Sequence, residues 1–167
     1  MTEIEKPSTE ALLWALQLNK NDQQTVNFDW YHIQSNTPYS VECLQNLELQ
    51  PEIIEALCTT ETRPRAIQFG DGMLIYLRGI NRNPNADPED MVSLRLWITQ
   101  NRVVSARRKG RQLQSVQDTK QQIENGEIPA SPLDLMLTII TKIADRISET
   151  VDELDEELSI FESLDKT

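Results

Sequence analysis

Apolar positions along the chain follow two different periods. Through most of the chain they alternate with polar positions, which predicts strands, whereas elsewhere they recur every three or four residues, which predicts helices. The expected strands are 12–18, 26–33, 65–69, 73–80, 91–98 and 102–108, and the expected helices are 40–47, 51–57, 112–124 and 132–164. The run 12–18 also fits a short helix, but the turn-like segment 19–22 and the alternating run after it favour a strand pair. We therefore predict an α+β body over residues 1–130, and residues 131–167 as the first part of a long stalk helix.

The last helix has a clear start and a heptad pattern. Ser131, Pro132 and Asp134 are residues that favour the first turn of a helix. Apolar residues then recur at alternating steps of three and four, namely Leu137, Ile140, Ala144, Ile147, Val151, Leu154, Leu158 and Phe161. A helix over 132–164 is roughly 50 Å long, more than a body with a radius of gyration of ~15 Å covers. We expect it to project, to need partner helices, and to continue beyond Thr167, since no stop signal precedes that residue.

Charge and composition narrow the function classes. The net charge is −11, but residues 61–120 sum to +5 and the remainder to −16. A negative total argues against nucleic-acid binding. The sequence contains no run of ~18 apolar residues, the length that a membrane-spanning helix needs. Cys43 and Cys58 have no CxxC spacing and no secretory signal precedes them, so we expect reduced, partly buried thiols in a soluble, cytosolic chain.

The chain offers few groups for catalysis. His32 is the only histidine and the only candidate base, and a structural, hydrogen-bonded histidine on a strand is the favoured alternative. Gly70-Asp71-Gly72 predicts a hairpin turn, because a strand follows it where a phosphate loop would be followed by a helix. One His and two separated Cys do not form a closed zinc site within one chain. We therefore expect no catalytic residue, no enzyme activity and no required cofactor.

Two charged clusters are candidate ion sites. The basic cluster consists of Arg107, Arg108, Lys109 and Arg111, and the acidic cluster of Glu149, Asp152, Glu153, Asp155, Glu156 and Glu157. For the first, a solvated or salt-bridged surface is the favoured interpretation. The alternatives are an anion site between a strand end and a helix start and contact with the acidic stalk of a second copy. The second is either the solvated outer face of a coiled coil or a weak carboxylate site for a divalent cation such as Zn²⁺ or Mg²⁺. Individual metal-binding residues are not identified.

The centre of the chain resembles a known family. The motifs are the run Thr62-Arg63-Pro64-Arg65, the GDG hairpin that leads to Leu77-Arg78-Gly79-Ile80-Asn81, and the strand pair around Asn101-Arg102 that ends in Val104-Ser105-Ala106-Arg107. Together they are similar to the cytoplasmic domain of the CorA superfamily of divalent-cation transporters, and specifically to its ZntB zinc-transporter branch. Trp30-Tyr31-His32-Ile33 resembles the family's Trp-x-His strand more weakly.

The resemblance implies an αβα body with a mixed, largely antiparallel sheet between helices. It also implies that five copies form a funnel on the cytoplasmic side of the inner membrane, with long helices that run into the pore. The family's Gly-x-Asn pore signature would lie beyond Thr167, so the cation, the direction and the coupling of transport are not specified. The main alternative is a free-standing soluble oligomerisation or anion-binding module, with an enzyme as the third hypothesis.

Overall fold

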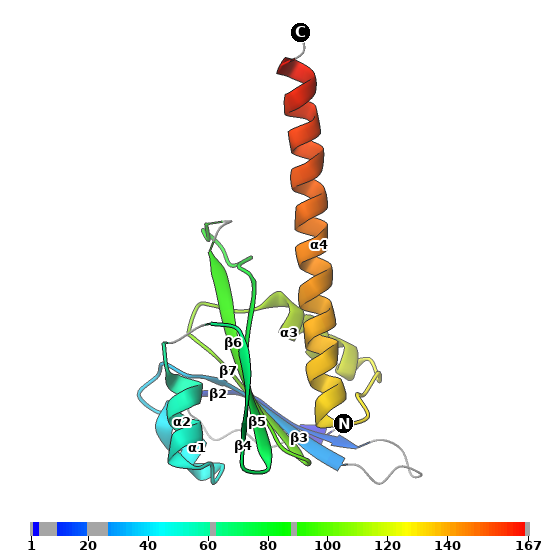
Figure 1. Cartoon of the computed structure of the whole chain (residues 1–167). Coiled ribbons are helices and arrows are strands. Elements are labelled where there is room, and N and C mark those ends of the chain that lie inside the picture. The colour runs from blue at the N-terminus through cyan, green and yellow to red at the C-terminus, as the bar shows by residue number, and fades with distance from the viewer. Residues whose placement is uncertain (1, 4–9, 20–26, 61–62, 88–89, 166–167) are drawn as a thin grey trace.

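The structure is a computed structural model that describes residues 2–3, 10–19, 27–60, 63–87 and 90–165. A body of strands and short helices carries one long helix, α4, which extends far beyond it (Figure 1). The elements in chain order are β1 Thr2–Glu3, β2 Leu12–Asn19, β3 Asn27–Gln34, α1 Ser40–Asn46, α2 Pro51–Cys58, β4 Arg65–Phe69, β5 Gly72–Ile80, β6 Met91–Ile98, β7 Arg102–Arg107, α3 Gln114–Glu124 and α4 Pro132–Asp165.

The described strands form one mixed sheet in the order β1-β2-β3-β7-β6-β5-β4. All neighbours are antiparallel except β3 and β7, which pair in parallel at the centre with Trp30 opposite Val103. The segment between β3 and β7 contains α1, α2 and the strands β4, β5 and β6. The predicted mixed, largely antiparallel sheet is confirmed.

Each face of the sheet has its own apolar core. One core gathers Trp14, Trp30 and Val92 with side chains of α3 and α4, whereas the other gathers Ile33, Leu74 and Trp97 with side chains of α1 and α2. The sheet therefore lies between two helical layers, as the family resemblance implied. The two helices that cover the first face, α3 and α4, also contact each other through the ion pair of Asp118 with Arg146.

The ends of the predicted helices agree with the structure where a specific signal marks them. The Asp134 amide donates to Ser131 Oγ over 3.1 Å at the start of α4. Gly126 has φ 97° just after α3, in the left-handed region that favours glycine. The structure differs from expectation in several details: β1 was not predicted, α3 begins at Gln114 rather than at residue 112, and β7 ends at Arg107 rather than at residue 108. Several other element ends differ by one residue. The expected turn at 19–22 lies mostly outside the described residues.

Gly72 was expected to provide a positive φ in the hairpin turn, but the structure shows that it is needed because a side chain there would clash with Trp97. Gly70 does adopt a positive φ, 56°, but Gly72 belongs to β5 and does not. A Cβ at Gly72 would lie 2.2 Å from Cη2 of Trp97, whose indole ring covers this position from β6. Gly72 therefore makes room for a core side chain.

We predict that Gly72→Ala lowers the free energy of unfolding by about 2 kcal/mol, because the buried indole of Trp97 has to move. Chemical denaturation followed by tryptophan fluorescence measures the change. Gln68→Ala, on the exposed face of neighbouring β4, is the matched control and should change stability by no more than about 0.5 kcal/mol. Equal stability of Gly72→Ala and the unmodified chain would contradict this packing argument.

Candidate functional site

The first turns of α4 pack on the body through one apolar face. Leu135, Met136, Ile139 and Ile143 are buried there and join the core beneath α3 and α4. Ile140 is only half-buried at the edge of this contact. From Val151 to Ser163 every side chain is exposed, so this last part of the 34-residue helix α4 extends beyond the body.

A second apolar face of α4 is exposed in the part of the chain that the structure describes. We call it the apolar stripe; its members are Leu133, Leu137, Ala144, Ile147, Val151, Leu154, Leu158 and Phe161. Leu137 is 47% exposed, although it lies at the level of the body, and Leu158 and Phe161 are 56% and 69% exposed. At 100° per residue the stripe lies about a quarter of a turn from the face that packs on the body. Seven of the eight predicted heptad positions are therefore exposed, and with Leu133 the stripe extends along about 40 Å of helix. The eighth, Ile140, packs instead against the edge of the core.

The predicted acidic cluster lies mainly on the other side of α4. All six of its carboxylates are exposed, and at 100° per residue most of them lie opposite the apolar stripe. Among the described residues there is no group of three or more His, Cys, Asp or Glu side chains arranged to hold a metal ion. The geometry therefore corresponds to the outer, solvated face of a helix that packs through its apolar stripe.

The predicted basic cluster does not act as one site. Arg111 forms a bidentate ion pair with Asp90 at 3.0 Å, which the sequence did not indicate. Arg107 is half-buried and donates to the Arg108 carbonyl. The Lys109 amide is bound by the Asn36 side chain. The salt-bridged alternative therefore describes Arg111, and α3 begins only at Gln114, three residues beyond it.

His32 is fully buried on β3. Its Nδ1 lies 2.6 Å from Ser105 Oγ, which also accepts a hydrogen bond from Trp30 Nε1 at 2.8 Å, and its ring stacks on Trp14 with centroids 4.3 Å apart. Burial, together with the nearby Arg107 charge, lowers the pKa of His32 to about 3. The contact joins a base to a hydroxyl, but both side chains have no exposed surface. The structural interpretation of His32 is therefore the one that fits.

The remaining candidate groups do not form a reactive site. Cys43 and Cys58 are free and half-buried, and burial raises the pKa of both thiols. A cavity of about 920 Å³ lies between the α1–α2 connection and the β4–β5 and β6–β7 turns, with Glu48, Asp71, Trp97 and Arg102 among its lining residues. His32 and both cysteines lie outside it. Of the described helices, none has the length and apolar character needed to cross a membrane.

Comparison with known proteins places this chain in a transporter family. The family model described as CorA-like Mg2+ transporter protein matches residues 26–164. The chain is also 33% identical over 141 residues to the zinc transport protein ZntB of Pectobacterium carotovorum, an alignment that covers 82% of this chain and 42% of that protein. The chain thus belongs to the CorA family, and the resemblance to its ZntB branch is confirmed. It spans less than half the length of this relative.

Solved structures agree with this assignment. The structure of the full-length CmaX protein superimposes with a TM-score of 0.86 at 28% identity, covering 96% of this chain and 53% of that one. The crystal structure of the ZntB cytoplasmic domain from Vibrio parahaemolyticus gives a TM-score of 0.74 at 26% identity, covering 92% and 62%. The fold is therefore that of the cytoplasmic part of this branch.

We predict that burial of neutral His32 makes the chain less stable as the pH falls. Its pKa is near 6.5 in the unfolded chain and about 3 in the folded one, so below pH 6.5 the unfolded state binds a proton that the folded state does not. The free energy of unfolding should decrease by about 1 kcal/mol between pH 7 and 5.5. Urea unfolding at these two pH values measures it.

His32→Gln is the control, because it removes the only imidazole in the chain. This variant is expected to be less stable overall but to lose the pH dependence between pH 7 and 5.5. A slope that persists in His32→Gln would assign the effect to other groups.

Proposed function

We propose that this chain is the cytoplasmic funnel domain of a homopentameric transporter of divalent cations, and that it contributes to the ion pathway and its gating without enzyme activity. In this proposal the funnel lies on the cytoplasmic side of the inner membrane, and α4 leads from it towards the pore. The family membership and the fold support the class. The observation that carries the proposal within this chain is the apolar stripe.

The apolar stripe supports self-association through α4. Transfer of one exposed leucine side chain from water to an apolar contact contributes about 1.5–3 kcal/mol, and heptad spacing aligns such side chains along a neighbouring helix. Closed cyclic symmetry lets each copy contact its neighbours in the same way, and the number five comes from the family. The acidic residues opposite the stripe then remain in solvent.

Charge opposes the same association. The net charge is −11 per chain, and acidic side chains concentrate on the upper part of α4, so neighbouring copies repel each other there. Salt screens charges separated by more than about 10 Å at 0.1 M. The assembly of this chain alone is therefore expected to be weak and to strengthen with salt.

The direct test is transport by the protein that the complete reading frame encodes. It would be reconstituted into vesicles that contain a zinc-sensitive dye, with Zn²⁺ and Mg²⁺ compared outside. Cation uptake supports the proposal. Absence of uptake, or a reading frame without two apolar segments separated by Gly-x-Asn, favours the alternative of a free-standing oligomerisation or anion-binding module.

We predict that Leu158→Asp weakens self-association of the chain at least about tenfold, because it places a charge within the apolar stripe. Ile160→Asp is the matched control, since Ile160 is 60% exposed on the same helix but lies outside the stripe. Static light scattering over a range of protein and salt concentrations measures both. Equal weakening by the two variants would mean that the stripe is not the contact surface.

We also predict that divalent cations bind this chain only weakly, with a Kd of about 10⁻⁴ M or higher, because carboxylates on an exposed helix do not enclose an ion. Calorimetric titration with Zn²⁺ and with Mg²⁺ measures this. Glu153→Gln together with Glu156→Gln should remove part of the heat. A submicromolar site that survives both substitutions would contradict the prediction.

A further inference from the structure

The last contacts between α4 and the body are polar and lie one helical turn apart. Asp118 of α3 accepts hydrogen bonds from Nε and Nη2 of Arg146. Arg82, which follows β5, donates from Nη2 to Thr150 Oγ1 over 3.0 Å. The Thr150 hydroxyl in turn donates to the Arg146 carbonyl over 3.1 Å, which fixes its orientation. Beyond Thr150 no described side chain of α4 is buried.

Arg82 is itself held by the segment around it. Asn81, which is buried, accepts hydrogen bonds at Oδ1 from the amide and the side chain of Asn83, over 3.0 and 2.7 Å. The Asn81 side chain also donates to Asp90 Oδ2 over 3.4 Å. Residues on both sides of Arg82 are therefore fixed where β5 ends.

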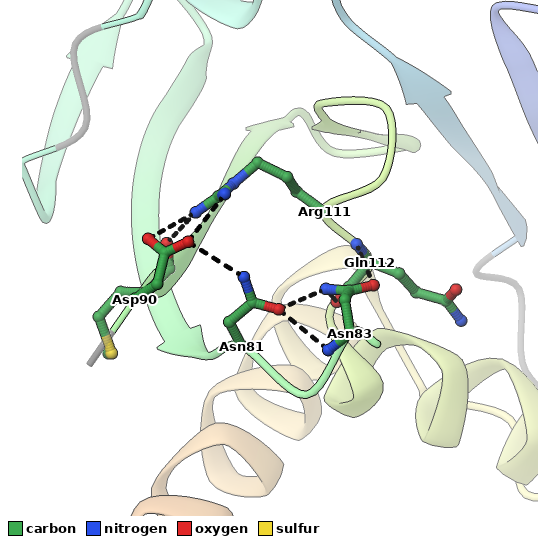
Figure 2. A network of polar contacts seen from close by, with 6 residues as sticks. Asn81, Asn83, Asp90, Arg111 and Gln112 are labelled. Carbon is green, nitrogen blue, oxygen red and sulfur yellow. Dashed lines mark hydrogen bonds and ion pairs between the residues drawn. The ribbon is translucent and has the colours of Figure 1, made fainter. Parts of the chain in front are cut away.

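The same segment is bound to the connection that precedes α3. Asn83 Nδ2 donates to the Gln112 carbonyl over 2.9 Å, and the Gln112 amide donates back to Asn83 Oδ1 over 3.2 Å. Arg111 forms its bidentate pair with Asp90 and also donates to the Met91 carbonyl over 2.7 Å. Figure 2 shows these side chains converging between the end of β5, the start of β6 and the connection to α3.

These contacts close a ring. It runs from Arg82 to Thr150 and Arg146 on α4, continues through Asp118 along α3 to Gln112, and returns through Asn83 to Arg82. Because hydrogen bonds depend on direction, and the ring contacts α4 farther from its base than the apolar packing at Ile143 does, the ring adds resistance to tilting of α4.

We propose that this ring, which we call the collar, sets the direction in which α4 leaves the body, with Arg82 and Arg111 as positioning residues. Arg82 fixes α4 directly, whereas Arg111 acts through Asp90 by holding the segment that carries Arg82. In the proposed pentamer this direction determines the width of the funnel. That consequence rests on the proposed function, but the direction itself is a property of the single chain.

Distances between spin labels in the whole chain test the collar. Labels at Glu52→Cys on α2 and Glu157→Cys on α4, both exposed positions, report the angle of α4. The native Cys43 and Cys58 are replaced by Ser, and labelled chains are diluted with unlabelled ones so that only distances within one chain are measured. Thermal unfolding of each variant shows whether it is still folded, so that a change in the direction of α4 is distinguished from unfolding.

Arg82→Ala and Thr150→Val should each broaden the label distance distribution about twofold without lowering the Tm, because they release the helix locally. The double variant should broaden it no further, since both substitutions remove one contact. Asp90→Asn, which weakens the pair with Arg111, should have a smaller effect in the same direction. Lys109→Ala is the control; it removes the same charge as Arg82→Ala at an exposed position away from α4 and should leave the distribution unchanged.

Unchanged distributions in Arg82→Ala and Thr150→Val would overturn the proposal and show that apolar packing alone directs α4. Broadening in Lys109→Ala as well would assign the effect to net charge and would also overturn it. If only the Asp90→Asn distribution is unchanged, Arg111 does not position α4 through Asp90, and that part of the proposal is wrong. Since these distances are measured within single chains, they are independent of the light-scattering and transport experiments that test the proposed function.

Discussion

Burial of the first three turns of α4 against the sheet is the interaction on which the rest of the structure depends. Leu135, Met136, Ile139 and Ile143 complete the core that also contains Trp14 and Trp30. This contact fixes the helix at its base, but α4 continues for about 30 Å beyond Ile143. A single body of this size does not cover such a length, so the upper helix needs a partner outside the chain or stays in water.

The helix α4 must be fixed at its base and must also present a surface to a partner farther along. It uses different side chains on different faces for these two purposes. Apolar packing supplies most of the stabilisation at the base, because it scales with buried area and needs no specific direction. Where α4 leaves the body, polar contacts of Arg146 and Thr150 take the place of apolar packing. Hydrogen bonds to partly exposed groups add little net stability, yet they depend strongly on geometry. Among the described residues, nothing covers the apolar stripe from Leu133 to Phe161.

Most of the secondary structure could be predicted from the sequence because its signals are local. Alternation located the strands from β2 to β7, and Ser131 and Gly126 marked helix ends through capping and a positive φ. Errors occurred where the decisive neighbour is distant. β1 is polar and forms by pairing with β2. Gly72 is required by Trp97 on another strand, and the ion-pair partner of Arg111 is Asp90, immediately before β6 rather than in the basic cluster.

The candidate site shows the same division between local pattern and tertiary contact. The sequence by itself determined that α4 is long, begins at Ser131-Pro132 and carries a heptad stripe, because helix period and capping depend on residues within one turn. It did not determine which face of α4 meets the body, since Leu135 and Ile139 fit a spacing of three and four residues as well as Leu137 and Ile140 do. The tertiary structure decided this, because Leu135 and Ile139 are fully buried in the core beside α3 whereas Leu137 is 47% exposed and Ile140 only half-buried. The collar was equally hidden, since Arg82 and Thr150 are 68 residues apart in the chain and become neighbours only when the sheet, α3 and α4 have packed together.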